Sequence, residues 1–596
     1  MNLFINKIKI LFKKIIYKIY KKKIKKLKIL YSYNILFGDI NINLLNLNFL
    51  NNKKKKKIGI LYGKILLKKY KKYIKNYKIK NFFLNINLKN LFYINFIKKI
   101  IKYKYKIKKF YFKKKNKKKK ILIEFSSPNS NKPLHIGHLR NILIGNTISN
   151  IYKILGYKII KSQIINNRGL HICKTIISYK YFNKKKLFKK KIKSDHLVGK
   201  LYFNFEEKLE KEINKISKKY KINKKQSLKY SKLFKLINKE LIKWENKNKK
   251  SIYIWKKINN YVYKGFKQTY NKLNIKFNET LYESDTYLLG KNIILNNLNK
   301  KIFFLDKDKS IFFKYKNKKI ILIRNNGTSL YITQEIGTLF YRFKKYKNLK
   351  LLIYVVGNEQ INHFNILFKI FKKLKIINNI KLYHLSYNSV NYFGKKIKSR
   401  FLNYKKNNFI FIDDLINKLN KIVKKKINKL NKNNNNFELI SLGAIKYYFL
   451  KVNNNKIINF NLKNILNLNG NTGIYIQYTY VRIYSILKRY KKKFFFIKNK
   501  INEYLKIIEY NEKLIIKYIL EYNKILLQIK NKYDTSILIN FLYKFTKIIN
   551  NFYNKNKILK IKNKYKKYLR LILCKIILNF LYLNMKILGI PILKKI

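Results

Sequence analysis

Two histidines with a glycine between them stand where a helix is expected to begin. His135 and His138 belong to the sequence HIGH, which follows the loop SSPNSNKPL and precedes an apolar pattern of helical spacing. A helix start carries unpaired N–H groups and the positive end of the helix dipole, and both attract phosphate. Imidazole donors there can hold a triphosphate while charge builds at its α-phosphorus, and Gly137 leaves room for a purine against the backbone. The pattern predicts a nucleotide site.

A metal site is the alternative use of such histidines, and their spacing disfavours it. In zinc sites of the HExxH type the histidines are four residues apart, with a carboxylate between them and a third ligand elsewhere. His171 and Cys173 form another short pair, but the second cysteine, Cys574, is distant in sequence. We predict no metal site, and we expect His171 and Cys173 to pack in the core and support the wall of the active site.

The elements that must position the histidines are those of a parallel α/β sheet. Residues 121–125 (ILIEF) predict a short buried strand, Pro128 and Pro133 stiffen the next loop, and residues 158–167 predict a second strand after the helix. In such sheets, ligands bind at the carboxyl ends of strands beside helix N-termini. We expect three later apolar runs to complete the sheet: 319–323 (KIILI), 351–357 (LLIYVVG) and 380–387 (IKLYHLSY).

Runs of lysine and asparagine divide the chain into three expected domains. The run KKKNKKKK separates a small α+β N-terminal domain, residues 1–115, from an α/β catalytic domain, residues 116–440. Within the latter, helical periodicity and high charge predict a helical insertion over about residues 185–275. After NKNNNNF the pattern is helical almost to the end, so residues 441–596 are predicted to form an α-helical domain. The predicted fold class is multidomain α/β.

The charge of the chain is extreme and has two competing explanations. The formal net charge is +118, from 142 Lys and Arg against 24 Asp and Glu. Such a field suits a polyanionic partner such as nucleic acid. Arginine, the cation best shaped for phosphates and bases, occurs at only eight positions, however, and Lys, Ile, Asn, Tyr and Phe share A/T-rich codons. Mutational drift in a very A/T-rich genome therefore explains much of the charge.

The first 23 residues are basic and amphipathic, which fits a transit peptide, a surface helix or an ordinary helix of the N-terminal domain. Transit peptides favour Arg and Ser, and this segment has neither, so we expect the ordinary helix. Lysines interrupt every apolar stretch before it reaches the ~18 residues of a membrane span. Two distant cysteines fit a reducing compartment. We expect a cytosolic protein without membrane association.

Around and beyond the HIGH tetrapeptide, the chain resembles the arginyl-tRNA synthetases, a class I family. Eight stretches match in the family's order, so the resemblance extends from residue 124 to residue 489. They are EFSSPNSNKPLHIGHLRN (124–141), INNRGLHICK (165–174), SDHLVGKLYFNFE (194–206), ESDTYLLGK (283–291), NNGTSLYITQEIGT (325–338), YVVGNEQINHF (354–364), GKKIKSR (394–400) and LNGNTGIYIQYTYVRIYSILKR (468–489).

The resemblance implies a Rossmann-like class I catalytic domain and a reaction in two steps. Arginine attacks the α-phosphate of ATP, bound with Mg²⁺, to give arginyl-adenylate and pyrophosphate. The arginyl group then passes to the 3′-terminal adenosine of tRNA(Arg). Both steps depend on positioning and charge stabilisation rather than on a covalent nucleophile. We expect the enzyme to be a monomer.

Five residues match family positions that contact the substrate arginine. They are Glu124, Asn129, Tyr331, Glu335 and Gln360. A buried carboxylate at Glu124 suits a bidentate bond to a guanidinium, and a cap on the following loop is the alternative. The family more often has Asp at position 335. The longer Glu335 side chain moves the carboxylate by about 1.5 Å, the length of one C–C bond.

The resemblance also assigns residues to ATP. His135, Gly137 and His138 keep the role derived above, the two histidines as catalytic residues, and Lys132 is a further cation for the phosphates. His363 is expected beside ATP, with a structural place in the wall as the alternative.

The second class I motif is altered in this chain. Residues 396–400 read KIKSR, with an extra lysine, where related sequences commonly have a single lysine before an apolar residue. We expect Lys398 to act catalytically on the pyrophosphate oxygens, with Lys396, Ser399 and Arg400 also at ATP. A solvated surface position is the alternative for Lys398.

The helical C-terminal domain carries aromatic residues interleaved with a cation: Tyr478, Tyr480 and Arg482. By resemblance this domain reads the anticodon side of the tRNA, and such residues suit stacking on unpaired bases. A buried aromatic stripe is the alternative. The N-terminal domain would, by the same resemblance, touch the tRNA elbow.

Two other functions compete with this interpretation. One is another HIGH-type nucleotidyl or aminoacyl transferase, which arginine-dependent use of ATP would distinguish. The other is a drifted, noncatalytic RNA-binding protein, which predicts a damaged active site. Glu124, Asn129 and the HIGH residues are nevertheless all present.

The charge generates a prediction about tRNA binding. Each phosphate that the protein neutralises releases counterions, with a log–log slope of roughly −0.7 to −0.9 per phosphate. We expect tRNA affinity, measured by filter binding, to fall steeply between low and physiological ionic strength. A flat titration would contradict an electrostatic role for the lysines.

Overall fold

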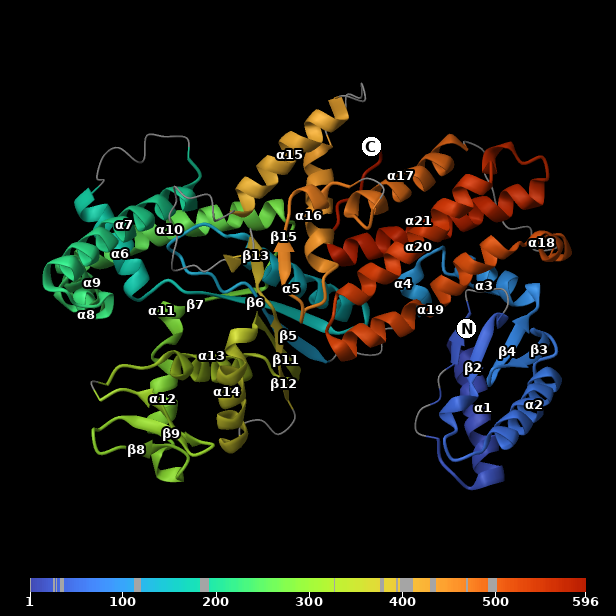
Figure 1. Cartoon of the computed structure of the whole chain (residues 1–596), viewed down its shortest axis with the longest axis horizontal. Coiled ribbons are helices and arrows are strands. Elements are labelled where there is room, and N and C mark those ends of the chain that lie inside the picture. The colour runs from blue at the N-terminus through green and yellow to red at the C-terminus, as the bar shows by residue number, and fades with distance from the viewer. Residues whose placement is uncertain are drawn as a thin grey trace.

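The fold was analysed in a computed structural model. It describes residues 2–24, 27, 29–32, 37–111, 119–182, 192–325, 327–375, 380–392, 395–396, 411–428, 436–467, 470–490 and 501–595. Figure 1 shows three parts side by side. The blue N-terminal domain lies at one end, the orange to red helical domain lies next to it, and the sheet with the green helices follows on the other side of that helical domain.

The N-terminal domain is an antiparallel sheet covered by helices. Its four strands lie in the order β1-β2-β4-β3. The first helix, α1, buries Phe4, Ile8, Phe12 and Ile16, which recur every four residues and so form one apolar face. It is therefore an integral helix of this domain. The elements are α1 (Asn2–Tyr20), β1 (Ile29–Tyr31), β2 (Ile40–Asn43), η2 (Leu44–Asn46), α2 (Asn52–Lys69), β3 (Ile74–Lys80), β4 (Phe83–Leu88), α3 (Asn90–Lys102) and α4 (Ile107–Tyr111).

The central sheet is parallel throughout, in the order β12-β11-β5-β6-β7. The first crossover runs from β5 (Lys120–Glu124) through α5 (Ile136–Ile154) to β6 (Lys158–Ile165), and the chain later returns to the other side of β5. Strand order therefore reverses at β5, and ligands bind at such a switch point in open α/β sheets. The remaining strands are β7 (Glu279–Tyr282), β11 (Leu349–Gly357) and β12 (Lys381–Tyr387).

A helical insertion lies between β6 and β7. It contains α6 (Leu170–Phe182), α7 (Ser194–Tyr220), α8 (Lys224–Tyr230), α9 (Lys232–Glu245) and α10 (Lys249–Lys272). After β7 come α11 (Glu283–Thr286), α12 (Leu289–Leu295), η3 (Leu298–Lys300), β8 (Phe304–Leu305), β9 (Ile311–Tyr315), β10 (Lys318–Ile323), α13 (Tyr331–Lys345), η4 (Asn358–Gln360) and α14 (Ile361–Lys373).

The prediction that KIILI joins the central sheet is wrong. These residues lie in β10, which pairs antiparallel with β9 in a separate three-stranded sheet. Ile321 is 44% exposed while Leu322 is buried, so the strand covers a core on one face only. Strands of a parallel sheet are buried on both faces. A short apolar run does not tell these two situations apart.

The C-terminal part is built from helices, with one small sheet joining it to the centre. In that sheet β13 lies between β14 and β15, so a strand following β12 pairs with one that follows α16. The elements are β13 (Val390–Tyr392), β14 (Lys395–Lys396), α15 (Ile412–Asn428), α16 (Phe437–Leu450), β15 (Ile458–Phe460), η5 (Lys463–Ile465), α17 (Gly473–Arg489), α18 (Ile501–Ile507), α19 (Tyr510–Lys532), α20 (Ser536–Lys555), η7 (Ile558–Lys560) and α21 (Lys564–Leu588).

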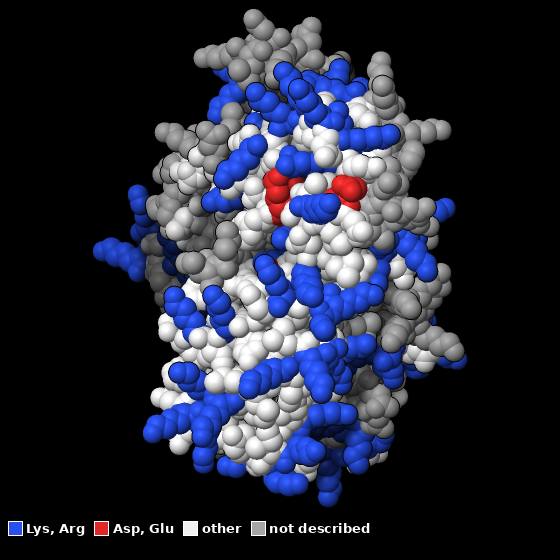
Figure 2. All heavy atoms as spheres, turned by 90° about the vertical axis from the view of Figure 1, so that its right-hand side faces the viewer, with Lys and Arg blue, Asp and Glu red and all other residues white. Residues whose placement is uncertain are grey.

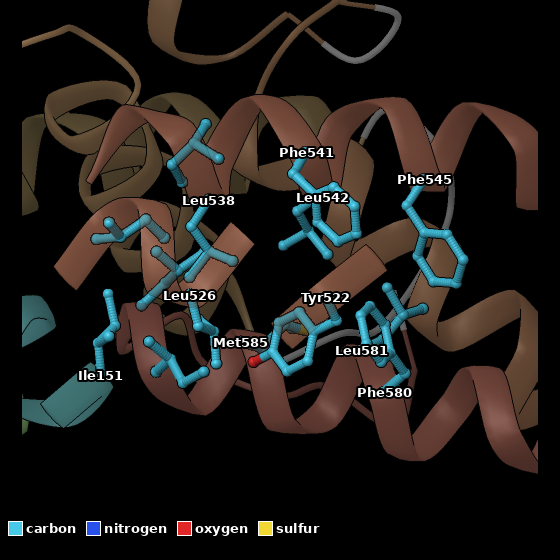
Figure 3. Close-up of a cluster of buried hydrophobic side chains, with 14 of the residues drawn as sticks. Ile151, Tyr522, Leu526, Leu538, Phe541, Leu542, Phe545, Phe580, Leu581 and Met585 are labelled. Atoms are coloured by element: carbon cyan, nitrogen blue, oxygen red, sulfur yellow. The ribbon is translucent and has the colours of Figure 1, made fainter. Parts of the chain in front are cut away.

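Helix α5 packs on both the sheet and the C-terminal helices. Fifteen of its 19 residues are buried. At Gly145 an added Cβ would lie 2.3 Å from the ring of Phe125, so only glycine permits this approach to the end of β5. At the far end of α5, Ile151 lies beside a cluster that includes Tyr522 of α19 and Met585 of α21 (Figure 3).

One described helix, α21, is long and apolar enough by length and composition to cross a membrane. In the fold, 67% of its most apolar 18-residue window is buried. Figure 3 shows Phe580, Leu581 and Met585 of this helix directed at side chains of α19 and α20. Packing in the core of the helical domain accounts for its composition.

A buried lysine joins the insertion to the C-terminal helices. Lys446 of α16 is 2% exposed, and its Nζ donates to the carbonyl oxygens of Leu273 at 2.6 Å and Gly589 at 2.7 Å. These two residues cap the C-terminal ends of α10 and α21, where unpaired carbonyls attract a cation. Burial lowers the pKa of Lys446 to about 7.

The lysine-rich surface is visible at the N-terminal end of the molecule. Lysines of α2 and β3 are exposed there, among them Lys56, Lys64, Lys75 and Lys78. Figure 2 views the molecule from the right-hand side of Figure 1 and shows Lys and Arg spread over the face, with few acidic residues.

A buried ion pair attaches the N-terminal domain to the C-terminal helices. Lys517 of α19 is 1% exposed, and its Nζ lies 2.6 Å from Asp39 Oδ1 and donates to the Ser32 carbonyl at 3.1 Å. Asn90 donates to the Leu505 carbonyl at 2.7 Å in the same interface.

We expect Asp39→Asn to lower the free energy of unfolding by roughly 3 kcal/mol, because it leaves the Lys517 ammonium buried without its counterion. Denaturant titration measures the change. Asp306→Asn is the matched control, since Asp306 pairs with the 59% exposed Lys319 at the surface, and we expect it to leave the midpoint unchanged. Equal midpoints for both variants would contradict the role of the buried pair.

Candidate active site

A cavity of about 370 Å³ lies at the carboxyl end of β5 and the start of α5. Its lining brings together residues from β5, the following loop, α5, α13 and the end of β11. Nine of the predicted site residues are in that lining: Glu124, Asn129, Lys132, His135, Gly137, His138, Tyr331, Glu335 and Gln360. His363 lies next to it, with its ring 5.5 Å from that of Tyr331.

The two histidines cap the helix that follows them. His135 is the N-cap residue, and its Nδ1 accepts from the Gly137 N–H at 3.1 Å, while His138 Nδ1 accepts from the His135 N–H at 3.1 Å. Because both Nδ1 atoms accept, the hydrogen bonds assign the proton of each neutral ring to Nε2. The two rings are in contact, with centroids 3.7 Å apart and their planes tilted by 32°. An added Cβ at Gly137 would lie 3.0 Å from the His135 ring, a tight contact that would press on this ring.

Burial and a nearby cation keep both rings neutral. Burial, His138 and Lys132 hold the pKa of His135 well below its ordinary value. Burial and Lys132 lower the pKa of His138 to about 3. Lys132 itself is 4% exposed, and burial lowers its pKa to about 8. The site therefore offers two neutral N–H donors where a phosphate would lie. It also offers Lys132, whose amine can gain or lose its proton near neutral pH.

Asn141 holds the turn between β5 and the histidines. Ser126 has φ of 64°, in the left-handed region, and its N–H donates to Asn141 Oδ1 at 2.6 Å. Asn141 Nδ2 donates to the carbonyl of Val355 at 2.5 Å and to the Tyr387 hydroxyl at 3.2 Å. One side chain of α5 thus joins the loop after β5 to strands β11 and β12.

Glu124 is paired with an arginine of the protein itself. Arg342 of α13 is fully buried and donates to Glu124 and, at 2.9 Å, to Ser162 Oγ. Its Nε lies 3.6 Å from Glu279 Oε2. The described hydrogen bond of Glu124 is thus to a buried arginine of α13.

Glu335 is the unusual acid of the cavity. Burial and the charge of Glu124 raise the pKa of Glu335 to about 8, although Arg342 and a hydrogen bond from Tyr331 oppose the rise. Its Oε2 is buried and has no hydrogen-bond partner among the described residues. A buried carboxyl with an open acceptor position suits a cationic ligand that donates hydrogen bonds.

The two largest fully buried side chains are arginines, Arg140 and Arg342. Arg140 of α5 donates to the carbonyls of Asn388 at 2.5 Å and Asn453 at 2.9 Å, next to the lining residue Ser389. Sequence reasoning missed both arginines and Asn141. The scarcity of arginine could have indicated the two arginines, because only eight of the 142 Lys and Arg residues are arginine.

One acidic cluster resembles a metal site but holds a lysine. The carboxylates of Asp195 and Asp413 lie with His196 within 4.8 Å of one another. Lys193 Nζ stands between the two acids, 3.1 Å from Asp195 Oδ2 and 2.7 Å from Asp413 Oδ2. The ammonium therefore supplies the positive charge that a metal would bring. This cluster also anchors the start of α15, where Phe411 forms a backbone bridge with His135.

Comparisons with known proteins place the chain in a family. The family described as tRNA synthetases class I (R), catalytic domain, matches residues 99–462, and the DALR anticodon binding domain matches residues 476–596. The chain belongs to the arginyl-tRNA synthetases. An arginine–tRNA ligase of Borrelia garinii subsp. bavariensis is 38% identical to this synthetase over 496 residues, 80% of each chain.

Two solved structures share the fold of this synthetase. The arginyl-tRNA synthetase of Plasmodium falciparum gives a TM-score of 0.72 at 23% identity, over 99% of both chains. That of Thermus thermophilus gives 0.74 at 18% identity, over 98% of both chains.

The remaining predicted residues of the synthetase are not in the lining of this cavity as the described residues define it. Lys396 ends β14, whereas Lys398, Ser399 and Arg400 lie outside the described residues. Cys173 is buried as predicted, but His171 is exposed and is not a core residue.

Of the α17 residues predicted to contact tRNA, some are at the surface and one is buried in the core. Tyr480 is 6% exposed and stacks on Tyr484, so its burial contradicts a role in stacking on bases. Tyr478 is 41% exposed, and the Arg482 guanidinium lies 4.2 Å from the centre of its ring. Tyr478 and Tyr480 are two residues apart in the helix, so their side chains point to different faces.

The raised pKa of Glu335 predicts a pH-dependent cost in stability. The folded state keeps this carboxyl protonated up to about pH 8, whereas the unfolded chain ionises it near its ordinary pKa. Stability is therefore lost as pH rises through this window. We expect Glu335→Gln to be more stable than the parent by roughly 2–4 kcal/mol at pH 8.5, and by much less near pH 5.

Denaturant unfolding across this pH range measures the difference. Glu207→Gln is the control, because Glu207 is 49% exposed in a surface pair with Lys211. A difference between parent and Glu335→Gln that does not change with pH would show that Glu335 is already ionised in the fold.

Proposed function

We propose that the protein activates L-arginine with ATP and transfers it to the 3′-terminal adenosine of tRNA(Arg), as an arginine–tRNA ligase of protein synthesis. The observation that carries this proposal is the cavity itself. It joins an acidic cluster, suited to a guanidinium, to a helix start with neutral imidazole donors and a buried lysine, suited to a triphosphate.

The arginine subsite consists of Glu335, Tyr331, Gln360, Asn129 and Glu124. The guanidinium donates to Glu335, whose open oxygen lies inside the cavity wall. Glu124 adds negative charge but is held in place by Arg342, so Glu335 makes the principal bond. The longer Glu side chain at 335 reaches the ligand while it keeps its bond to Tyr331.

The ATP subsite consists of His135, Gly137, His138, Lys132 and His363. When the arginine carboxylate attacks the α-phosphorus, negative charge grows on the phosphate oxygens, and the Nε2–H groups of the two histidines stabilise it. Neutral rings do this without repelling Lys132. His363 carries a buried Nε2 with no partner among the described residues, beside Tyr331.

The leaving pyrophosphate is held by the altered second motif, with Lys398 as the catalytic cation and Lys396, Ser399 and Arg400 as further contacts. The chain on either side of this motif supports the assignment. Lys396 belongs to the small sheet with β13, next to lining residue Val390, and Phe411 is bridged to His135.

Mg²⁺ bound with ATP would screen the charge of the phosphates. The ion favours phosphate oxygens, waters and one or two carboxylates. Glu359 fits that requirement, because it lines the cavity and is distinct from the acids around Tyr331.

Three domains share the tRNA. The catalytic domain, residues 116–440, receives its 3′ end, while residues 441–596 take the anticodon side through surface groups such as Tyr478 and Arg482. Residues 1–115 meet the elbow with their exposed lysines. The enzyme works as a cytosolic monomer without membrane association. The nine predicted residues that line one cavity argue against a drifted, noncatalytic RNA-binding protein.

Aminoacylation of tRNA with each of the twenty radiolabelled amino acids tests this function. We expect charging with arginine alone. His138→Asn places a carbonyl oxygen near Nδ1 and so preserves the helix cap, yet it removes the Nε2–H donor, and we expect kcat to fall by roughly 10²–10³. His138→Ala should lose both activity and cap.

The matched variants separate chemistry from folding. His138→Asn should unfold at the parent's denaturant midpoint, and His138→Ala at a lower one, because a lost cap costs roughly 1 kcal/mol. Charging with another amino acid would overturn the arginine subsite. Full activity in His138→Asn would overturn the role of its Nε2–H.

A further inference from the structure

A short backbone pairing holds the residues just before the helix that carries the two histidines. Phe411 forms an antiparallel bridge with His135. Beside it, the N–H of Ile412 donates to the Leu134 carbonyl at 2.9 Å. The N–H of His135 is itself donated to His138 Nδ1. A shift of this peptide would therefore redirect both imidazole rings and their Nε2–H groups.

The segment that pairs with His135 continues into an ion cluster at the start of α15. Asp413 is 5% exposed, and its Oδ2 accepts from Lys193 Nζ at 2.7 Å and from Thr269 Oγ1 at 3.1 Å. Lys193 caps the start of α7 and Thr269 belongs to α10, so both partners come from the helical insertion. Burial alone would raise the pKa of Asp413, but hydrogen bonds from His196 and Lys193 outweigh it and hold this pKa well below its ordinary value. The contact is therefore a full ion pair.

The helical insertion also contacts the histidine loop at a second point. At Gly199 of α7 an added Cβ would lie 2.7 Å from Pro133 Cδ, so the backbone of the helix packs directly on this loop. At Gly265 of α10 an added Cβ would lie 2.4 Å from Asp195 Cγ, so α7 and α10 approach each other equally closely. Such close packing leaves little room for small displacements. The insertion thus forms one support that reaches both Pro133 and Asp413.

From these contacts we propose that Asp413 is a positioning residue for the first step of the reaction. It ties residues 411–412 to the helical insertion, and these residues hold the backbone of Leu134 and His135, from which the imidazole donors project. Asp413 is not among the described residues of the cavity lining, so it acts through His135 and not on the substrate. The inference rests on the proposed function and adds the support of its histidines.

The variant Asp413→Asn keeps the size of the side chain and removes its charge. We expect it to lower kcat/KM for ATP by about tenfold to a hundredfold, because a displacement of about 1 Å at a catalytic group has an effect of that order. KM for arginine should not change, since Glu124 and Glu335 are held by β5 and α13. Steady-state aminoacylation, with ATP and arginine varied in turn, measures both quantities.

Asp195→Asn is the matched control from the same cluster. Asp195 is fully buried and lies 3.1 Å from the same Lys193 Nζ, but the hydrogen bonds of its carboxylate, to Lys193 and to the N–H of His196, stay within the helical insertion. We expect both variants to lower the denaturant midpoint, and only Asp413→Asn to lower kcat/KM for ATP. Equal catalytic losses in the two variants, or none in either, would overturn the positioning role.

A milder variant, Thr269→Val, keeps every charge of the cluster. It removes the hydroxyl that bonds Asp413 at 3.1 Å and Lys193 at 2.5 Å. We expect a smaller loss of kcat/KM for ATP, about fivefold, since one hydrogen bond is worth about that factor. A value equal to that of the parent, or a loss confined to arginine, would overturn the role of the cluster.

Imidazole nitrogen NMR of histidine-labelled protein gives a readout that does not depend on charging. His196 touches the cluster and marks both aspartate variants, whereas the signals of His135 and His138 should move only in Asp413→Asn. Single substitutions His135→Gln and His138→Gln assign these signals. Arginine charging by the parent, with both signals unmoved in Asp413→Asn, would remove the positioning role and leave the proposed function standing. Signals that move, without charging of any amino acid, would support the positioning role and remove the proposed reaction.

Discussion

The burial of α5 is the constraint on which the rest of the structure depends. Its first turn carries both histidines, while 15 of its 19 residues are enclosed by the central sheet and the C-terminal helices. Asn141 and Arg140, one turn into the helix, reach strand β11 and the carbonyls beside β13. A helix held along its length keeps its first turn in place without loops having to order it. The positions of the two histidines therefore depend on the packing of α5 in the core.

The C-terminal helices consequently belong both to the matched anticodon domain and to the core around α5. The matched anticodon domain supplies α19, α20 and α21, and these same helices complete the core around Ile151 of α5. The N-terminal domain attaches to that bundle through Lys517 and Asp39. Packing is thus continuous from the N-terminal domain through the C-terminal helices to α5 in the centre of the molecule, and the domains are not independent units.

Cations of two kinds have different places in this fold. Lysine covers the surface, where it is easily replaced, but Arg140 and Arg342 lie fully buried, each bonding several oxygens at once. A guanidinium can satisfy several acceptors in one plane, which an ammonium cannot. A buried lysine holds its charge less well. At Lys446, for example, desolvation lowers the pKa to about 7. Both buried arginines therefore stand at positions that require a planar fork.

Local sequence was sufficient for some of these features and insufficient for others. ILIEF and LLIYVVG, buried runs ending at the site, predicted their strands because parallel strands are apolar on both faces. Of the nine cavity residues, His135, Gly137 and His138 followed from the pattern at the helix start, and the other six from the resemblance. The pairing of Glu124 with Arg342 joins residues 218 positions apart, and no local pattern encodes such a contact. The burial of Tyr480 and the separate sheet of β10 likewise depend on which faces are covered, which only the tertiary fold decides.

The internal pairing of Glu124 with Arg342 has a consequence for competing ions. With Glu124 paired to Arg342 and Glu335 largely protonated near neutral pH, the acidic side of the pocket has little net charge. It therefore has little attraction for potassium or for the ammonium group of lysine, both of which are abundant around a translation enzyme. Only a ligand that offers several hydrogen bonds as well as charge gains enough to displace the proton from Glu335. If the pocket takes arginine as proposed, binding exchanges the Glu335 proton for a guanidinium, and a spherical cation makes this exchange poorly.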